Sequence, residues 1–236
     1  MLNIENLFYS FRLADVPKLA DVFAAARTHS VIPQDFDPDY FVTRSDAETS
    51  ALRRSLDLMP DERSILKAEE AHSIEKWREF SSSVSTRAAQ AQEIPAPSTS
   101  PGTAINYAVK QGFVSFGGVE TRLAEVATAV ADLFGEPCRV QGDFYYPRLG
   151  FRTWHTNRFD PPGWRMYIVD VDVPRRSYFR VKVPATGEIR TEWDDEGTVN
   201  FFLIDPARVL WHCIGSETNR WSKGFKVPAD WQCRVL

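Results

Sequence analysis

The chain is poor in cysteine, in histidine and in long apolar runs, and these shortages argue against some classes of protein. Its 236 residues include only 3 cysteines, Cys138, Cys213 and Cys233, which form neither a Cys-x-x-Cys pair nor an even set. A disulfide framework is therefore not expected, and a reducing compartment is favoured. No stretch approaches the roughly 18 apolar residues of a membrane-spanning helix. Because the N-terminus also lacks a basic start followed by an apolar run, we expect a cytoplasmic protein with no membrane partner.

An excess of charge of either sign is absent as well. The formal net charge is -4 and the isoelectric point is about 5.6, so electrostatics give no reason to expect nucleic acid as a partner. The hydrophobic fraction of 43% and the charged fraction of 25% are those of an ordinary globular chain. Aromatic residues are plentiful at 13%, with 7 tryptophans, which favours an aromatic-lined pocket or a β-rich core.

The first hundred residues favour helices. After a short apolar strand at 7–13, Asp15 is placed to cap a helix that has Pro17 in its first turn. A charged stretch at 60–80 repeats the helical spacing, and the Pro/Ser-rich run at 95–103 has nothing apolar to bury. We therefore predict a mainly helical N-terminal region, residues 1–105, that ends in this Pro/Ser-rich loop.

A further helix and then a series of strands are predicted in residues 106–236. The helix, at about 117–136, has an apolar stripe that includes Leu123, Val126, Val130 and Leu133, and Gly135 ends it. Short β-type runs separated by turn clusters follow: "CRVQGDFYYP", "WRMYIVDVDV", "SYFRVKV", "TVNFFLI", "RVLWHCI" and "WSKGFKV". Strands at short spacing without helices between them indicate an antiparallel sandwich or barrel.

Two of the 4 histidines fall within this β region, each after a tryptophan and each at a predicted strand end. They are His155 in "TWHTN" and His212 in "LWHC". Imidazoles on neighbouring strands could share one divalent metal ion, although a histidine beside tryptophan is often a hydrogen-bonded core residue. Arg220 and Ser222 follow closely, and a guanidinium beside a hydroxyl is suited to bind a carboxylate. A metal could thus hold one end of a dicarboxylate while Arg220 holds the other.

In this order the residues resemble the iron(II)- and 2-oxoglutarate-dependent oxygenases, and within them the prolyl-hydroxylase-like group. The residues that carry the resemblance are Tyr146 and Pro147, His155, Gly163 and Arg165, then His212, Arg220 and Ser222. The resemblance implies a double-stranded β-helix, or jelly roll, which agrees with the strand count. The fold class expected is therefore α+β, a jelly-roll core at 106–236 with the helical N-terminal half packed on it.

The resemblance also implies a site and its cofactors. His155 and His212 would bind iron(II), and Arg220, with Ser222 and Tyr146, would bind the distal carboxylate of 2-oxoglutarate. With O2 as the third cofactor, such a protein would hydroxylate a small molecule or an amino-acid side chain, so its partner would be a small-molecule or peptide substrate. The alternatives are a two-histidine halogenase of the same superfamily and a non-catalytic jelly-roll binding protein.

One position departs from the family pattern, because Asn157 stands where the family has the Asp or Glu of its His-x-Asp/Glu motif. A neutral amide oxygen is a poorer ligand for a hard cation than a carboxylate. Four explanations are open. Asn157 ligates the metal through its oxygen, or Asp160 or Asp170 reaches the metal instead. In the third, the third position is left to water or halide; in the fourth, the metal site has decayed.

Other marked residues have weaker assignments. We consider Arg165, Trp154 and Tyr167 as substrate-binding residues; for Arg165 the alternative is a surface ion pair, and for Trp154 a place in the core. In "WDDEG" the pair Asp194 and Asp195 is interpreted as a solvated hairpin turn.

Overall fold

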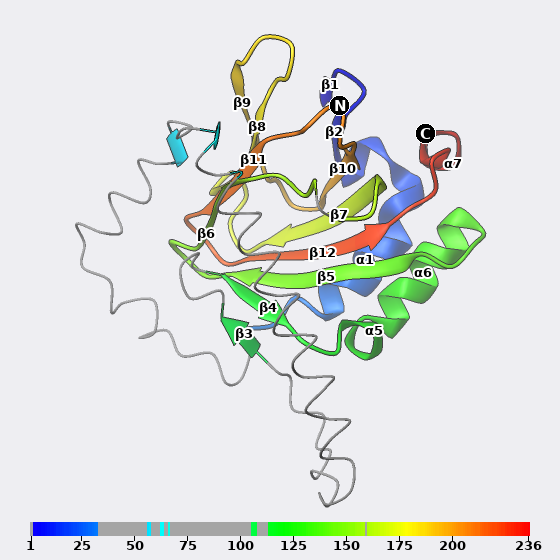
Figure 1. The fold of residues 1–236 in the computed structure, drawn as a ribbon. Coiled ribbons are helices and arrows are strands. Elements are labelled where there is room, and N and C mark those ends of the chain that lie inside the picture. Colours follow the sequence, from blue (N-terminus) through cyan, green and yellow to red (C-terminus); the bar gives the residue numbers. More distant parts are fainter. Residues whose placement is uncertain are drawn as a thin grey trace, which may run out of the picture.

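The helices and strands whose bounds the structure describes form two antiparallel β-sheets, with helices on the outer face of the larger one (Figure 1). The computed structural model describes residues 2–32, 56–57, 62–63, 66, 105–107, 113–158 and 160–236. The predicted loop at 95–103 and most of the predicted charged helix at 60–80 lie outside these residues. Among the residues described, no helix has the length and the hydropathy that crossing a bilayer requires.

The larger sheet has eight strands, and each is antiparallel to its neighbours. Its order is β1 (Leu2–Ile4), β2 (Phe8–Arg12), β10 (Thr198–Ile204), β7 (Gly163–Val171), β12 (Arg220–Lys226), β5 (Arg139–Tyr146), β4 (Val114–Phe116) and β3 (Ile105–Tyr107). The central strands carry side chains that are buried on both faces of the sheet. Strands β7 and β10 are mainly apolar, as such burial favours, whereas β12 also buries Arg220, Ser222 and Lys223.

The smaller sheet has four strands and supplies both histidines. Its order is β6 (Phe151–His155), β11 (His212–Ser216), β8 (Ser177–Lys182) and β9 (Ile189–Trp193). Strands β8 and β9 form the hairpin whose turn contains Gly187, at a φ of 71° that favours glycine. The inner faces of the two sheets meet in an aromatic layer, where the rings of Phe8 and Phe179 stack at 5.2 Å.

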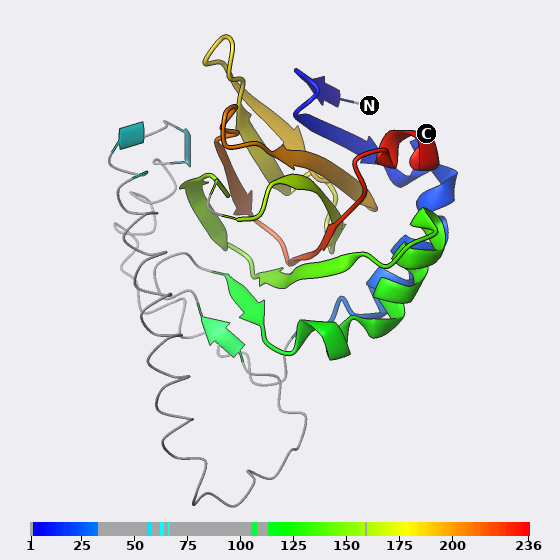
Figure 2. The ribbon, with the colours of Figure 1, turned by 45° about the vertical axis from the view of Figure 1, so that its right-hand side comes forward.

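The helices cover the outer face of the larger sheet, on the side away from the smaller sheet (Figure 2). They are η1 (Leu13–Asp15), η2 (Pro17–Leu19), α1 (Ala20–Thr28), α5 (Val119–Arg122), α6 (Ala124–Phe134) and α7 (Trp231–Val235). In α6 the predicted stripe is confirmed at Val126 and Val130, and Phe134 completes it while Leu133 is only partly buried. Gly135 ends the helix at a φ of 66°, as its position predicts.

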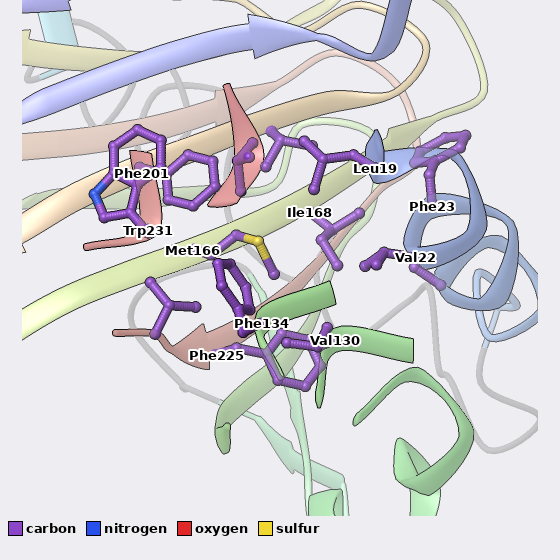
Figure 3. Close-up of a cluster of buried hydrophobic side chains, with 14 of the residues drawn as sticks. Leu19, Val22, Phe23, Val130, Phe134, Met166, Ile168, Phe201, Phe225 and Trp231 are labelled. Atoms are coloured by element: carbon purple, nitrogen blue, oxygen red, sulfur yellow. The ribbon is translucent and has the colours of Figure 1, made fainter. Parts of the chain in front are cut away.

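A continuous apolar core joins these helices to the sheet (Figure 3). Met166 and Ile168 of β7 and Phe225 of β12 point outward to meet Val130 of α6, and all four side chains are almost fully buried. Because side chains alternate along a strand, Arg165, Tyr167, Arg220 and Ser222 of the same two strands face the other way. One face of the larger sheet therefore packs against the helices, and the other face carries these polar side chains toward the smaller sheet.

The prediction of a mainly helical N-terminal half is not confirmed. Residues 2–12 form β1 and β2, and β2 pairs along its length with β10 of the larger sheet. The run "FYSFR" at 8–12 explains this placement, because its aromatic side chains are buried on both sides of the strand. The division of the chain at residue 105 stays a prediction.

Candidate functional site

The two histidines lie directly opposite each other on adjacent strands. His155 ends β6, His212 begins β11, and the strands pair these two residues in register. Their ring centroids are 4.1 Å apart, and a bulge just after His212 lets the ladder continue at a shifted register. Trp154 and Cys213, the neighbours of the two histidines, are buried in a separate cluster on the other face.

Backbone carbonyls fix the tautomer of both rings. Nδ1 of His155 lies 2.7 Å from the oxygen of Thr153, and Nδ1 of His212 lies 3.0 Å from that of Leu210. A carbonyl oxygen only accepts, so each Nδ1 carries a proton, and each neutral ring keeps a lone pair on Nε2. Nε2 of His155 is buried and has no hydrogen-bond partner among the described residues.

Burial keeps these rings neutral. It lowers the pKa of His212 to about 3, and it lowers the pKa of His155 well below its usual value, with the nearby charge of Arg152 acting in the same direction. A neutral imidazole with its Nδ1 proton given to a carbonyl is the state in which histidine binds a metal. The orphaned Nε2 of His155 therefore fits a divalent metal ion shared with His212.

A cavity with about 340 Å³ of space, part of it open to solvent, lies beside the two rings. Its aromatic and apolar walls are Phe144, Tyr146, Tyr167, Phe179, Phe202 and Ile214. Its polar lining consists of Arg152, His155, Asn157, Asn200, His212, Arg220 and Ser222. The structure thus brings together both predicted metal ligands and all three residues predicted to bind 2-oxoglutarate.

A buried ion pair forms the end of the cavity at Arg220. Its Nε donates a hydrogen bond of 2.8 Å to Asp194, and both side chains are about 1% exposed. Ser177 donates to the same carboxylate oxygen at 2.7 Å. Nη1 of Arg220 has no partner among the described residues and remains available to a ligand. The guanidinium carbon lies 5.1 Å from the centre of the Tyr146 ring.

This pair corrects the interpretation of Asp194 as part of a solvated turn. Asp194 is fully buried, whereas its neighbour Asp195 is partly exposed and forms an ion pair with Arg12 at 3.4 Å. The turn-like composition is real, but a buried guanidinium requires a buried counter-charge, and Asp194 provides it.

The third metal ligand is not a carboxylate in the part of the chain that the structure describes. There, no group of three His, Cys, Asp or Glu side chains is placed to hold a metal ion. Asp160 is exposed and does not line the cavity. Asp170 faces away from the cavity. The alternation of side chains along β7 places it on the helix-covered face, where its charge acts on Lys223. Of the three residues considered for the third ligand, only Asn157 lines the cavity with the two histidines.

Two polar residues of the cavity were missed in the sequence. Asn200 of β10 is fully buried, and neither its amide nitrogen nor its amide oxygen has a hydrogen-bond partner among the described residues. Arg152 of β6 is half-buried, lines the cavity beside Tyr146 and packs over the ring of Phe113. The sequence did contain an indication of Asn200, because an amide in the middle of the apolar run "TVNFFLI" is expected to be buried and to need a hydrogen-bond partner.

The three residues considered for substrate binding lie in different places. Tyr167 lines the cavity, and burial raises its pKa to about 12. Arg165 is buried but donates to the carbonyls of Pro161, Gly163 and Trp164, so it holds the preceding loop. Trp154 lies in the cluster behind the smaller sheet. The roles of all three remain predictions.

A second, smaller hollow of about 240 Å³ adjoins the first. Asn157, Phe202 and His212 line both of them. His212 thus lies between the two spaces, whereas His155 lines only the larger one.

No protein-family model and no curated protein matches the sequence. The chain is similar to solved structures, among them several of 2-oxoglutarate and iron(II) oxygenases. They include a Pseudomonas putida prolyl-4-hydroxylase, at 15% identity and a TM-score of 0.33 over 64% of this chain and 85% of that one.

Two further matches are similar in strength. A Burkholderia pseudomallei oxidoreductase of the 2OG-Fe(II) oxygenase family is 15% identical, with a TM-score of 0.32 over 44% of this chain and 50% of that one. A Trichoplax adhaerens prolyl hydroxylase, in complex with a hypoxia inducible factor peptide, is 11% identical, with a TM-score of 0.36 over 61% and 74%. At TM-scores this low, the function has to be argued from the cavity itself.

Proposed function

We propose that this protein is an iron(II)- and 2-oxoglutarate-dependent oxygenase that oxidises a small molecule or an amino-acid side chain. The observation that carries the proposal is the pair of neutral imidazoles, His155 and His212, paired in register with their Nδ1 atoms bound to carbonyls. When bound, iron(II) and 2-oxoglutarate supply the oxidation of a C–H bond by O2, which is chemistry of the cofactors. The chain supplies ligands, orientation and exclusion of water.

Each residue of the cavity has a role in this proposal. His155 and His212 would hold the metal through Nε2, with the amide oxygen of Asn157 as a neutral third ligand. Arg220 would hold the distal carboxylate of 2-oxoglutarate through Nη1, and Ser222 would donate a hydroxyl to it. The aromatic wall would keep water away, which strengthens each of these charged contacts.

Asp194 holds the guanidinium of Arg220 in one orientation. With Nε bound to Asp194, the guanidinium plane cannot turn, and its remaining donors keep one direction. A pre-ordered donor loses less side-chain entropy on binding than a mobile one. This is the reason to expect a specific dicarboxylate and not general attraction of anions.

A second candidate function is non-catalytic binding of a carboxylate ligand in the same cavity. It is favoured by the absence, in the described part of the chain, of a third acidic or imidazole ligand beside the two histidines. The halogenase alternative differs from hydroxylation only in what occupies the third position, and the neutral Asn157 leaves that position without a protein charge.

Anaerobic absorption spectroscopy separates these functions. Addition of iron(II) and 2-oxoglutarate should produce the weak visible charge-transfer band of the metal-bound oxo-acid. His155→Ala and His212→Ala should each abolish the band, while Arg220→Ala should weaken 2-oxoglutarate binding by roughly tenfold to a hundredfold and leave the metal in place. Absence of the band at saturating ligand, in a folded protein that still binds 2-oxoglutarate, would support the binding protein instead.

A further inference from the structure

Arg152 gives the cavity a positive charge that the proposed cofactors do not use. It lies on β6, three residues before His155, and lines the same cavity as both imidazoles and Tyr146. Its guanidinium carbon is 5.6 Å from the centre of the Phe113 ring, so an aromatic face supports it from one side.

The two arginines of the cavity differ in how their charge is balanced. Arg220 is paired with Asp194 at 2.8 Å, whereas Arg152 forms no ion pair with any acidic side chain in the described ranges of the chain. The histidines are neutral, and Asn157 and Asn200 carry no charge. Together with Asp194, the described side chains that line the cavity therefore sum to one positive charge, and a partly desolvated cation of this kind favours an anionic occupant.

The excess positive charge of the cavity remains when the charges of the proposed cofactors are added. A divalent metal adds two positive charges and 2-oxoglutarate removes two, so the charge of Arg152 is still unmatched. A site whose third metal ligand were a carboxylate would already be neutral at this point, but Asn157 supplies no charge. One more negative group can therefore enter the cavity, next to the imidazoles.

We propose that Arg152 is the recognition residue for a substrate carboxylate, and that the substrate is a carboxylic acid with an apolar body. The inference rests on the proposed function and names its substrate class. The guanidinium would bind the carboxylate, and the walls formed by Phe144, Tyr167, Phe179 and Phe202 suit an aromatic or aliphatic remainder. Asn200, with both amide atoms unpartnered among the described residues, is placed to hydrogen-bond a polar group of either ligand.

Calorimetry with phenylacetate as the probe tests this assignment. The full chain is loaded anaerobically with iron(II) and saturating 2-oxoglutarate, and phenylacetate is then titrated. Arg152→Gln should weaken phenylacetate binding by roughly tenfold to a hundredfold and change 2-oxoglutarate binding less than about threefold. Arg152→Lys should restore part of the loss. The control is Arg148→Gln, which removes an exposed arginine near the same strands and should change neither affinity.

Several results would overturn the inference. Equal phenylacetate affinity in the wild type and in folded Arg152→Gln would do so, and so would competition between phenylacetate and 2-oxoglutarate for one site. Arg152-dependent binding of chloride without binding of phenylacetate would replace the acid by a halide. If 2-oxoglutarate binds but phenylacetate does not, only the substrate class fails, whereas failure of 2-oxoglutarate to bind removes the proposed function as well.

Discussion

The two faces of strand β12 use buried charge in opposite ways. On the helix-covered face, Lys223 lies near Asp143 and Asp170, and Arg122 bonds Asp143 at 2.5 Å, so two basic and two acidic side chains balance. Lys223 also donates to the hydroxyl of Ser30 at 3.0 Å. The charges on this face balance one another, and these contacts attach the helices to the sheet.

The cavity face of the same strand is left incomplete. Arg220 is paired, but its Nη1, Nε2 of His155 and both amide atoms of Asn200 have no partner within the described ranges. Each unpartnered buried group costs free energy that a folded protein ordinarily avoids. Charges are therefore matched on the structural face, although Asp143 Oδ1 and Trp231 Nε1 also lack a partner there among the described residues. On the cavity face the unpartnered groups converge on one cavity, where a ligand can complete their hydrogen bonding. The predictions below test this contrast.

The largest effect is expected from Asp194→Ala. The substitution leaves the guanidinium of Arg220 buried without its counter-charge, which should lower the free energy of unfolding by about 3 to 5 kcal/mol. Urea denaturation measures the loss, and Asp195→Ala, whose ion pair with Arg12 is partly exposed, should cost less than about 1 kcal/mol. Equal losses in the two variants would contradict a special role for Asp194.

Neighbouring residues of β7 should separate stability from binding. Met166 belongs to the helix-side core and is fully buried, so Met166→Ala should lower the free energy of unfolding by about 3 kcal/mol without changing the affinity for 2-oxoglutarate. Tyr167→Phe, one residue along and facing the cavity, should show the reverse pattern: little change in stability and a measurable change in ligand binding. A folded Met166→Ala variant with much weaker 2-oxoglutarate binding would show that the faces are not independent.

The sequence allowed the strands and one half of the cavity to be predicted. Alternating and apolar runs reveal strands, and the ordered set from Tyr146 to Ser222 identified side chains that the fold does place around one cavity. The role of Asp194 could not be found this way, since "WDDEG" is typical of a turn and its partner Arg220 lies on the other sheet. Likewise, nothing local to residues 2–12 indicates that they pair with β10, because strand pairing over such a distance depends on the whole fold.

The charged cluster on the helix-covered face should make stability depend on pH in the alkaline range. Burial lowers the pKa of Lys223 to about 8, from 10.5 in the unfolded chain. Between these values the unfolded state binds more protons, so stability should rise with pH, by about 1 to 2 kcal/mol between pH 8 and 9.5. In Lys223→Met this rise in stability with pH should be absent, as measured by urea denaturation at each pH. An unchanged pH dependence of the free energy of unfolding would assign it to another group.

The smallest effect on stability is also the sharpest test of the contrast, and it concerns Asn200. Asn200→Leu replaces a fully buried amide without partners by an apolar side chain, so the protein free of ligands should gain about 1 kcal/mol of stability. The same variant should bind 2-oxoglutarate or phenylacetate more weakly, because it can no longer complete the hydrogen bonds of the ligand. Such an exchange of stability for binding is expected where a polar group is kept for function. Denaturation and calorimetry on one preparation measure both quantities, and a variant that loses stability while binding both ligands normally would show that Asn200 serves the fold.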